Sequence, residues 1–261
     1  MTESETTQLP TLFNVLLIGD RCIDEYKIGT VDRLSPEAPV PVFKLVETYS
    51  LAGMSANVLN NFVALGVNPD FVSNDETITK TRFIDKKSGQ HLLRMDQEHS
   101  LTPWSNRLLS PPHEYDAIVI SDYDKGFLTY ESIRYLVEMS KCPVFIDTKK
   151  KDLAFFGQDP RVYVKINDAE SKLATSKPTN LIVTKGDEGA EYNGVRHPTN
   201  RVEVMDVCGC GDTFLAALTT EYLYTKDIEK AIIYANKAAS ITVQHRGNYS
   251  PTCEEISKIS G

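Results

Sequence analysis

The sequence has no excess of basic residues. Its 28 Lys and Arg residues stand against 36 Asp and Glu residues, which gives the 261-residue chain a formal net charge of −8. Nucleic acids and anionic membranes bind basic surfaces, so this balance argues against both as partners. It leaves room for a small anionic substrate, which needs only a local cluster of cations and backbone N–H groups.

Long apolar runs are also absent. No run approaches the roughly 20 residues that a membrane-spanning helix needs, and the polar segment Met1–Gln8 lacks the apolar region of a signal peptide. We expect that segment to be a frayed leader. The cysteines are few, odd in number and scattered, which favours a reduced, cytoplasmic protein. They are Cys22, Cys142, Cys208, Cys210 and Cys253.

The sequence offers little for direct metal binding. Its five histidines lack the spacing of metal ligands, and no Ser/His/Asp set is recognisable. The pair Cys208 and Cys210 has no second Cys/His cluster to complete a zinc site. A redox switch and small residues filling a tight turn are the other roles for this pair. We expect no metal ion bound directly by side chains.

Short apolar runs alternate with segments of helical periodicity. The sequence predicts buried strands at 14–18, 117–121, 144–146, 162–166 and 181–184, and helices at 55–65, 131–140, 213–224 and 228–239. This alternation is typical of an α/β fold with a mostly parallel sheet and helices on both faces. No repeat or low-complexity linker interrupts the chain, so we predict one domain spanning 1–261.

A second, smaller sheet is predicted near the N-terminus. Proline in Arg33–Pro41 excludes a central strand there, and favours a loop or a sheet edge. The run 42–46 is a strand candidate. Residues 81–95 alternate like a hairpin with its turn at Lys87–Gln90. We predict that parts of 24–48 and 80–96 form a lid over the ligand crevice.

Polar residues follow the predicted strands of the main sheet. They are Asp20, Asp122, Asp147, Asn167 and Lys185. Ligands of parallel sheets bind at the carboxyl ends of the strands. These side chains therefore predict a single crevice.

The segment Asp206–Thr213 is the most informative part of the chain. Gly209 and Gly211 flank one small residue, and a helical pattern follows at once. Converging N–H groups and a helix N-terminus suit a phosphate or a developing phosphoryl charge. Asp212 lies where a general base for a sugar hydroxyl is needed. A plain loop-to-helix turn with an aspartate near its N-cap is the alternative.

Other residues fit a sugar phosphate and a nucleotide. Carboxylates at Asp20 and Asp24 and the amide of Asn57 can bind hydroxyls, while Gly53 permits close approach. Three cations could hold a substrate phosphate: Arg82, Arg94 and Lys125. Asn167 and Glu170 have the spacing of a water-mediated Mg²⁺–phosphate network. Solvated surface charges and helix caps are the structural alternatives for all of them.

Taken together, these segments resemble the ribokinase-like (PfkB-type) carbohydrate kinases. Asp206–Asp212 matches the family signature D-x-T-G-A-G-D with Cys at both variable small positions. The run Leu34–Val42 is far more specific, and is similar to the heptose 7-phosphate kinases within that family. Further matches are Gly19–Asp20 with Asp24 and Tyr26, Ser121–Tyr123 with Lys125–Gly126, Ile146–Lys149, Val183–Thr184 with Glu188–Gly189, and Tyr234–Asn236. The resemblance extends from about Asn14 to the C-terminus.

The resemblance implies a three-layer α/β/α sandwich with a β lid, and ATP-dependent phosphorylation of a sugar hydroxyl. For heptose 7-phosphate the product is the 1,7-bisphosphate. Asp212 is then the base, and Gly209, Cys210 and Gly211 form the anion hole. The implied sugar ligands are Asp20, Asp24, Gly53, Asn57 and Asp122, with Arg82, Arg94 and Lys125 for the phosphate. The implied ATP and Mg²⁺ residues are Lys149, Asn167, Glu170, Lys185, Gly186, Asp206, Asn236 and Gly247. A homodimer paired through the lids is expected, and dependence on a monovalent cation is left open.

Three departures from the family pattern stand out. Ala52 replaces a glycine, Asp147–Lys149 reads D-T-K where D-P-K is usual, and the chain passes almost directly from Ser73 to Thr77. Relatives usually carry an extra strand–helix unit at that last point. Other sugars, a nucleoside, or a non-catalytic binder of sugar phosphates or nucleotides therefore remain as alternatives.

Overall fold

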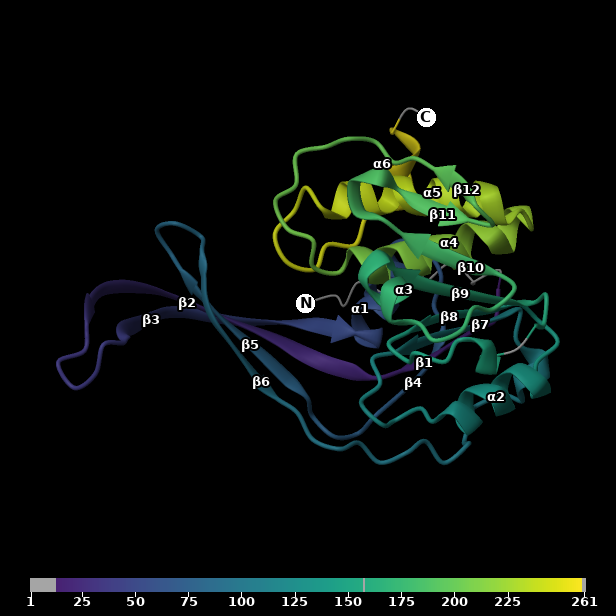
Figure 1. The fold of residues 1–261 in the computed structure, drawn as a ribbon, viewed down its shortest axis with the longest axis horizontal. Helices are drawn as coiled ribbons and strands as arrows, with labels where there is room; N and C mark the ends of the chain where they lie inside the picture. Colours follow the sequence, from purple (N-terminus) through teal and green to yellow (C-terminus); the bar gives the residue numbers. More distant parts are fainter. Residues whose placement is uncertain (1–12, 157, 260–261) are drawn as a thin grey trace, which may run out of the picture.

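The computed structural model describes residues 13–156 and 158–259. The expected leader Met1–Gln8 lies outside them. The main body is a three-layer α/β/α sandwich, and a four-stranded lid sheet projects from it as a long arm (Figure 1). No helix of the described residues is long and apolar enough to cross a membrane.

The central sheet has eight strands in the order β12-β11-β10-β9-β8-β7-β1-β4. Neighbours from β4 to β10 are parallel, and β11 and β12 are antiparallel. In chain order the strands are β1 Val15–Gly19, β4 Asp70–Ser73, β7 Ala117–Asp122, β8 Val144–Thr148, β9 Val162–Asn167, β10 Leu181–Thr184, β11 Ala190–Tyr192 and β12 Val195–His197.

Alternate side chains of these strands enter two separate cores, as the pleat requires. Leu16 and Ile18 of β1 pack with helix α2, whereas Val15 and Leu17 pack with α1, α4, α5 and α6. Both faces are therefore covered, and the strands read as continuous apolar runs. The helices are α1 Ser55–Ala64, α2 Tyr130–Met139, α3 Asp168–Leu173, α4 Cys210–Thr225, α5 Ile228–Thr242 and α6 Cys253–Ser257.

The lid sheet has the strand order β3-β2-β5-β6. Its strands are β2 Arg21–Leu34, β3 Pro41–Met54, β5 Thr79–Asp85 and β6 His91–Gln97. The proline-rich stretch connects β2 to β3. β3 is an edge strand, which agrees with the rule that proline is excluded from the central strands of a sheet. The β5–β6 hairpin agrees with the prediction. The lid strands extend beyond the predicted ranges 24–48 and 80–96.

The expected strands and helices are present, with ends that differ by a few residues. One difference affects the site: α4 begins at Cys210, three residues before the predicted start at Thr213. Asp212 therefore lies inside the first turn of α4. The sequence did not predict strands β2, β4, β11 and β12.

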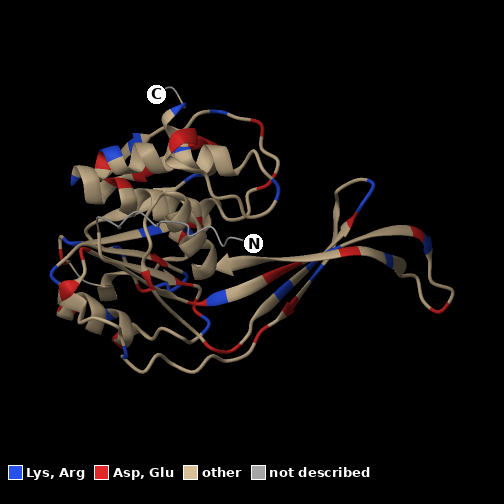
Figure 2. Ribbon diagram, turned by 180° about the vertical axis from the view of Figure 1, so that it is seen from behind, with Lys and Arg blue, Asp and Glu red and all other residues tan. Residues whose placement is uncertain are grey.

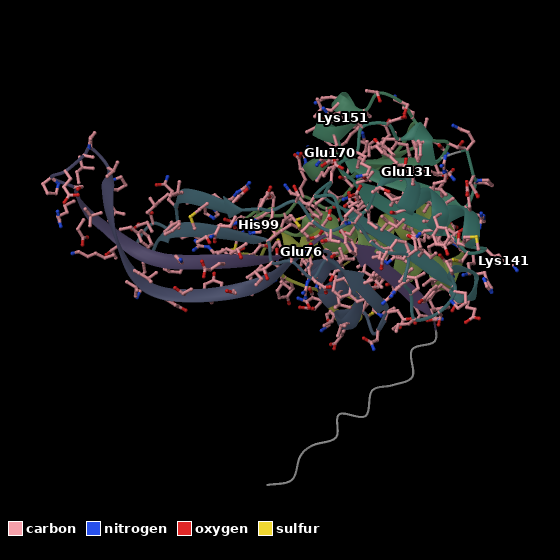
Figure 3. All side chains as sticks on the ribbon, turned by 90° about the horizontal axis from the view of Figure 1, so that it is seen from below. Glu76, His99, Glu131, Lys141, Lys151 and Glu170 are labelled. Atoms are coloured by element: carbon pink, nitrogen blue, oxygen red, sulfur yellow. The ribbon has the colours of Figure 1, made fainter. Side chains whose placement is uncertain are left out.

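The short connection after β4 is held by one buried side chain. Asn74 Oδ1 accepts from the Arg21 amide at 2.7 Å, and its Nδ2 donates to the Glu76 carbonyl at 2.6 Å. β4 is the edge strand of the described sheet, so the chain passes from this edge directly into the lid. Glu76 lies at the base of the arm (Figure 3).

Candidate active site

Asp212 is the centre of the candidate site. Its side chain is buried, and its two oxygens accept hydrogen bonds from Asn57 Nδ2 at 2.8 Å and from the Tyr123 hydroxyl at 2.9 Å. Burial raises the pKa of Asp212 to about 6, and the charge of Asp147 adds to the rise, while the bonds from Asn57 and Tyr123 oppose it. A carboxylate with a pKa near neutrality is suited to general-base catalysis.

The turn before Asp212 leaves backbone N–H groups open. Gly209 precedes α4 with a φ of 75°, and no side chain of the described part of the chain caps the helix. A Cβ on Gly209 would lie 2.7 Å from Asn57 Nδ2 and 2.9 Å from Asn248 Oδ1, so only glycine fits there. Uncapped N–H groups at a helix N-terminus favour an anion. The turn at Gly209, Cys210 and Gly211 therefore has local features that the predicted anion hole requires.

Both cysteines of this turn carry neutral thiols. Burial raises the pKa of Cys210 to about 12 and also raises the pKa of Cys208. Neither thiol forms a disulfide. A protonated thiol is a poor nucleophile and a poor metal ligand, so this chemistry favours the role of small residues that fill a tight turn.

A buried ion pair between Lys165 and Asp147 contacts the same turn. Lys165 Nζ donates to Asp147 Oδ2 at 2.7 Å and to the Gly211 carbonyl at 3.4 Å. Burial alone would lower the pKa of Lys165, but the Asp147 carboxylate outweighs it, and the pKa is raised. Lys165 therefore stays cationic beside Asp212. Sequence reasoning did not select Lys165, although a lysine inside an apolar strand is a usable signal.

Two predicted sugar ligands offer free acceptor atoms. Asp20 Oδ2 accepts from the backbone N–H of Tyr123 at 2.6 Å, which fixes the loop after β7. Asp20 Oδ1 and Asn57 Oδ1 are buried and have no hydrogen-bond partner among the described residues. Burial, and then the charge of Asp122, raises the pKa of Asp20 to about 6. Unpaired acceptors of this kind fit sugar hydroxyls.

Asp24 and Arg82 form an ion pair within the lid sheet, and Asn248 of the body contacts it. Arg82 Nη1 lies 2.5 Å from Asp24 Oδ1, and both side chains are largely buried. Asn248 Nδ2 donates to the other Asp24 oxygen at 3.3 Å and to the Ala52 carbonyl at 2.6 Å. A Cβ on Gly53 would collide with the Asp24 carboxylate. Arg82 was predicted to bind phosphate, but its charge is taken up by Asp24 in this structure.

The other three predicted sugar-phosphate ligands point to different partners. Asp122 accepts from Thr148 Oγ1 at 2.6 Å and pairs with Lys150, outside the hydrogen-bond network of Asp212. Arg94 pairs with Asp96 at 2.7 Å. Lys125 pairs with Glu98 at 2.6 Å, while its backbone N–H reaches Asp20 at 3.4 Å.

A cavity of about 670 Å³ lies on the other side of the anion hole. Cys210 and Gly211 line it, together with Gly186 and Asn236, both predicted to bind nucleotide. Val202, Val204, Val207, Phe214 and Val243 give it apolar walls. The volume and the mainly apolar lining fit a nucleotide base and ribose. Asn236 Nδ2 donates to the His197 carbonyl at 2.8 Å, so this amide shapes the wall.

Lys185, Asp206 and Gly247 were also predicted to bind nucleotide, but they are not among the residues that line the cavity. Lys185 pairs with Glu191 at 2.6 Å. Asp206 accepts from the N–H groups of Cys208 and Gly247, each at 2.9 Å, and so ties the anion-hole loop to the loop after α5. Asp206 and Gly247 thus shape the site through the backbone.

Asn167 and Glu170 form a capping box at the start of α3. Asn167 Oδ1 accepts from the Glu170 N–H at 2.8 Å, and Glu170 Oε2 accepts from the Asn167 N–H at 2.9 Å. Glu170, labelled in Figure 3, also pairs with Lys149. No group of three or more His, Cys, Asp or Glu in the described ranges could hold a metal ion. Any Mg²⁺ in this region would therefore keep most of its water ligands.

Comparison with known proteins agrees with this geometry. A family model described as pfkB family carbohydrate kinase matches residues 134–255, which contain the glycine turn, Asp212 and all the residues that line the cavity.

The family model thus places residues 134–255 among the pfkB family carbohydrate kinases.

Named relatives extend the match to most of the chain. The bifunctional protein HldE of a Nitratiruptor species is 32% identical over 302 residues, covering 93% of this chain and 64% of that protein. HldE of Aliivibrio salmonicida is 30% identical over 312 residues, covering 95% and 65%. The chain thus spans slightly less than two thirds of the length of these relatives.

Solved structures show the same fold. Ribokinase from Thermotoga maritima superimposes with a TM-score of 0.72 at 18% identity, covering 94% of this chain and 98% of that one. Phosphofructokinase-2 from Escherichia coli in complex with potassium gives 0.69 at 14% identity, covering 94% and 98%. The α/β ribokinase-like fold with its lid is therefore confirmed.

Tyr123 is the main residue of the candidate site that sequence reasoning missed. Its hydroxyl bonds Asp212, and the Nζ atoms of Lys80 and Lys149 lie 5.5 and 5.4 Å from its ring centroid. Burial raises its pKa well above 10, so the hydroxyl keeps its proton and acts as a donor. The motif containing Tyr123 was recognised, but Asp122 was chosen within it. Neighbouring residues at a strand end point to opposite sides, and the sequence does not say which side holds the ligand.

Proposed function

We propose that this chain is an ATP-dependent sugar kinase whose acceptor is a sugar phosphate, with heptose 7-phosphate as the preferred one and the 1,7-bisphosphate as product. The match to the family model supports phosphoryl transfer to a sugar hydroxyl. The similarity of Leu34–Val42 to heptose 7-phosphate kinases, and the match to HldE proteins, support the choice of acceptor. The other activities of a bifunctional protein are outside this proposal.

The observation that carries the proposal is the position of Asp212. Its carboxylate accepts a hydrogen bond from Asn57, which also carries a free acceptor atom, and the adjacent Gly211 lines the nucleotide-sized cavity at an uncapped helix N-terminus. Asp212 accepts the proton of the attacking hydroxyl as the new bond forms. The N–H groups of Gly211 and Asp212 donate to the negative charge that develops on the transferred group.

The donor is ATP, bound in the cavity lined by Gly186, Asn236 and Val243. Mg²⁺, when bound with it, neutralises phosphate charge, and Asn167 and Glu170 would hold its water ligands. Lys149, already paired with Glu170, lies next to that position. Asn57 and Tyr123 hold the base, and Asp20 and Asn57 present acceptors to sugar hydroxyls.

A panel of acceptors tests the proposal. ADP release is measured with Mg-ATP and heptose 7-phosphate, sedoheptulose 7-phosphate, fructose 6-phosphate, ribose, fructose or adenosine. We expect turnover with heptose 7-phosphate, and a loss of at least ~10²-fold in Asp212→Asn, the scale of a general base. Preference for another acceptor would change the substrate and keep the kinase. Ligand binding without any turnover would make the protein a non-catalytic binder.

We also propose that two copies pair through their lids. The lid face turned away from the crevice exposes Ile23, Leu93 and Met95, at 42%, 60% and 40% of their surface. A second copy would cover these side chains. Sedimentation equilibrium should give a dimer for the unaltered chain and a monomer for Leu93→Asp. A monomeric unaltered chain at micromolar concentration would contradict this pairing.

A further inference from the structure

One face of the lid sheet carries two rows of polar side chains toward the body. Lys80 of β5 is paired in register with Asp24 of β2 and with Asp96 of β6. In the next row, Arg82 is paired with Tyr26 and Arg94 in the same way. Directly opposite residues of neighbouring strands share a face. Because Asp24 contacts the body through Asn248, this is the face over the crevice. Figure 2 shows both signs of charge along the arm.

The cations around the crevice differ in their partners. Four of them form ion pairs with carboxylates, namely Arg82 with Asp24, Arg94 with Asp96, Lys125 with Glu98 and Lys149 with Glu170. Among the described residues, Lys80 has no carboxylate within ion-pair distance, and its Nζ lies 5.5 Å from the centroid of the Tyr123 ring. The pKa of Asp96 is lowered mainly by Arg94, and the charge of Lys80 lowers it further. Because no carboxylate is bonded to it, the Lys80 ammonium group can still bind an anion.

Lys80 is also close to the reacting centre. The ring that it contacts belongs to Tyr123, whose hydroxyl bonds Asp212. Lys80 is thus separated from the proposed base by a single aromatic side chain. It approaches from the lid, on the side of Asp24, and is not among the residues that line the nucleotide cavity.

We propose that Lys80 binds the phosphate group of the acceptor sugar, an inference that rests on the proposed kinase function. Breaking the buried pair of Arg82 and Asp24 would leave a carboxylate without its partner, so Arg82 is poorly placed to bind a new anion. Lys80 has no such pair to break, and a flexible ammonium group is a common phosphate ligand. Its position on the lid makes acceptor recognition depend on the lid.

Calorimetric titration of the full chain tests this assignment without turnover. The titrants are heptose 7-phosphate, the same heptose without phosphate, and a non-hydrolysable ATP analogue with Mg²⁺. The variants are Lys80→Met, Lys80→Arg and the control Lys27→Met. Lys27 is also a lid lysine beside an aromatic ring, but it lies on the opposite face and pairs with Glu25.

We expect Lys80→Met to weaken heptose 7-phosphate binding by about 10-fold or more, the usual effect of losing a charged hydrogen bond. Binding of the neutral heptose and of the ATP analogue should stay unchanged. Lys80→Arg should restore most of the affinity for the phosphate, and Lys27→Met should behave like the unaltered chain.

The assignment would be overturned if Lys80→Met and the unaltered chain bound heptose 7-phosphate equally well. It would also be overturned if the variant lost as much affinity for the neutral heptose, or if only binding of the ATP analogue were weakened. No binding of heptose 7-phosphate to the unaltered chain would also reject it. A different result would reject the proposed kinase activity and not the phosphate site. Binding that depends on Lys80, without ADP release in the acceptor panel, would retain the phosphate site and reject the kinase.

Discussion

Replacing Tyr123 with Phe should shift the pH dependence of turnover. The Tyr123 hydroxyl donates to Asp212 at 2.9 Å and favours the charged carboxylate, so its removal must raise the pKa of Asp212. The phenylalanine ring keeps the surface that Lys80 and Lys149 contact. The substitution therefore removes one hydrogen bond and little else.

The size of the shift follows from the energy of that bond. A hydrogen bond to a charged group contributes about 1.5 to 3 kcal/mol, and roughly 1.36 kcal/mol corresponds to one pKa unit, so an increase of about 1 to 2 is expected. The pKa of Asp212 begins at about 6. The acidic limb of kcat/KM should then move from about pH 6 to about pH 7 to 8, with activity recovering toward about pH 9.

The assay is initial-rate ADP release between about pH 5 and about pH 9, with kcat and KM separated. Tyr163→Phe is the matched control, because its hydroxyl contacts Tyr222 at 3.3 Å, away from the site. An acidic limb that stays in place in Tyr123→Phe would refute the reasoning. A uniform loss of activity at all pH values would assign Tyr123 a structural role instead.

Other predictions concern stability and the anion hole. The native pKa of Asp212 lies above the ordinary value of 3.8, so its ionisation destabilises the fold as pH rises from about 4 to above 6. The free energy of unfolding of Asp212→Asn should therefore exceed that of the unaltered chain by an amount on the order of 3 kcal/mol at about pH 8, with a higher melting temperature. At about pH 4 the two proteins should be nearly equally stable. Equal melting at the higher pH would contradict this. Gly209→Ala places a Cβ 2.7 Å from Asn57 at a φ of 75°, and should lower kcat at least ~10-fold; an unchanged kcat would show that the turn has room. Lys165→Met leaves Asp147 buried and unpaired, which should destabilise the chain by about 3 to 5 kcal/mol in urea unfolding. The double variant with Asp147→Leu should recover part of that loss, and a stable single variant would argue against the pair.

The sequence predicted the central sheet well because its strands are buried on both faces. Runs such as 117–120 and 181–183 are continuously apolar, which is typical of buried strands in a parallel sheet. Strand β2 was missed for a physical reason. Its buried positions include Asp24, whose charge is compensated by Arg82, 58 residues further along the chain. A local pattern of apolar residues does not reveal such a pair. The short strands β4, β11 and β12 carry too few residues for a periodic signal.

For the site, the sequence identified the residues that belong to a motif and missed those that depend on tertiary contacts. Asp212 and its glycine turn follow from the Asp206–Asp212 segment. The roles of Tyr123 and Asp122 depend on which side of β7 faces α4, and on the partners that Asp122 finds in Thr148 and Lys150. Lys80 became a candidate only when the ion pairs of the surrounding cations were known.

Phosphorus NMR of the full chain with Mg-ATP and heptose 7-phosphate would show whether Asp212 is the base in phosphoryl transfer from ATP to a sugar phosphate. We expect a second sugar-phosphate signal that grows as ATP is converted to ADP, at a rate at least ~10²-fold lower in Asp212→Asn. Conversion at the same rate in both proteins, or ADP formation with free phosphate as the only other product, would contradict it.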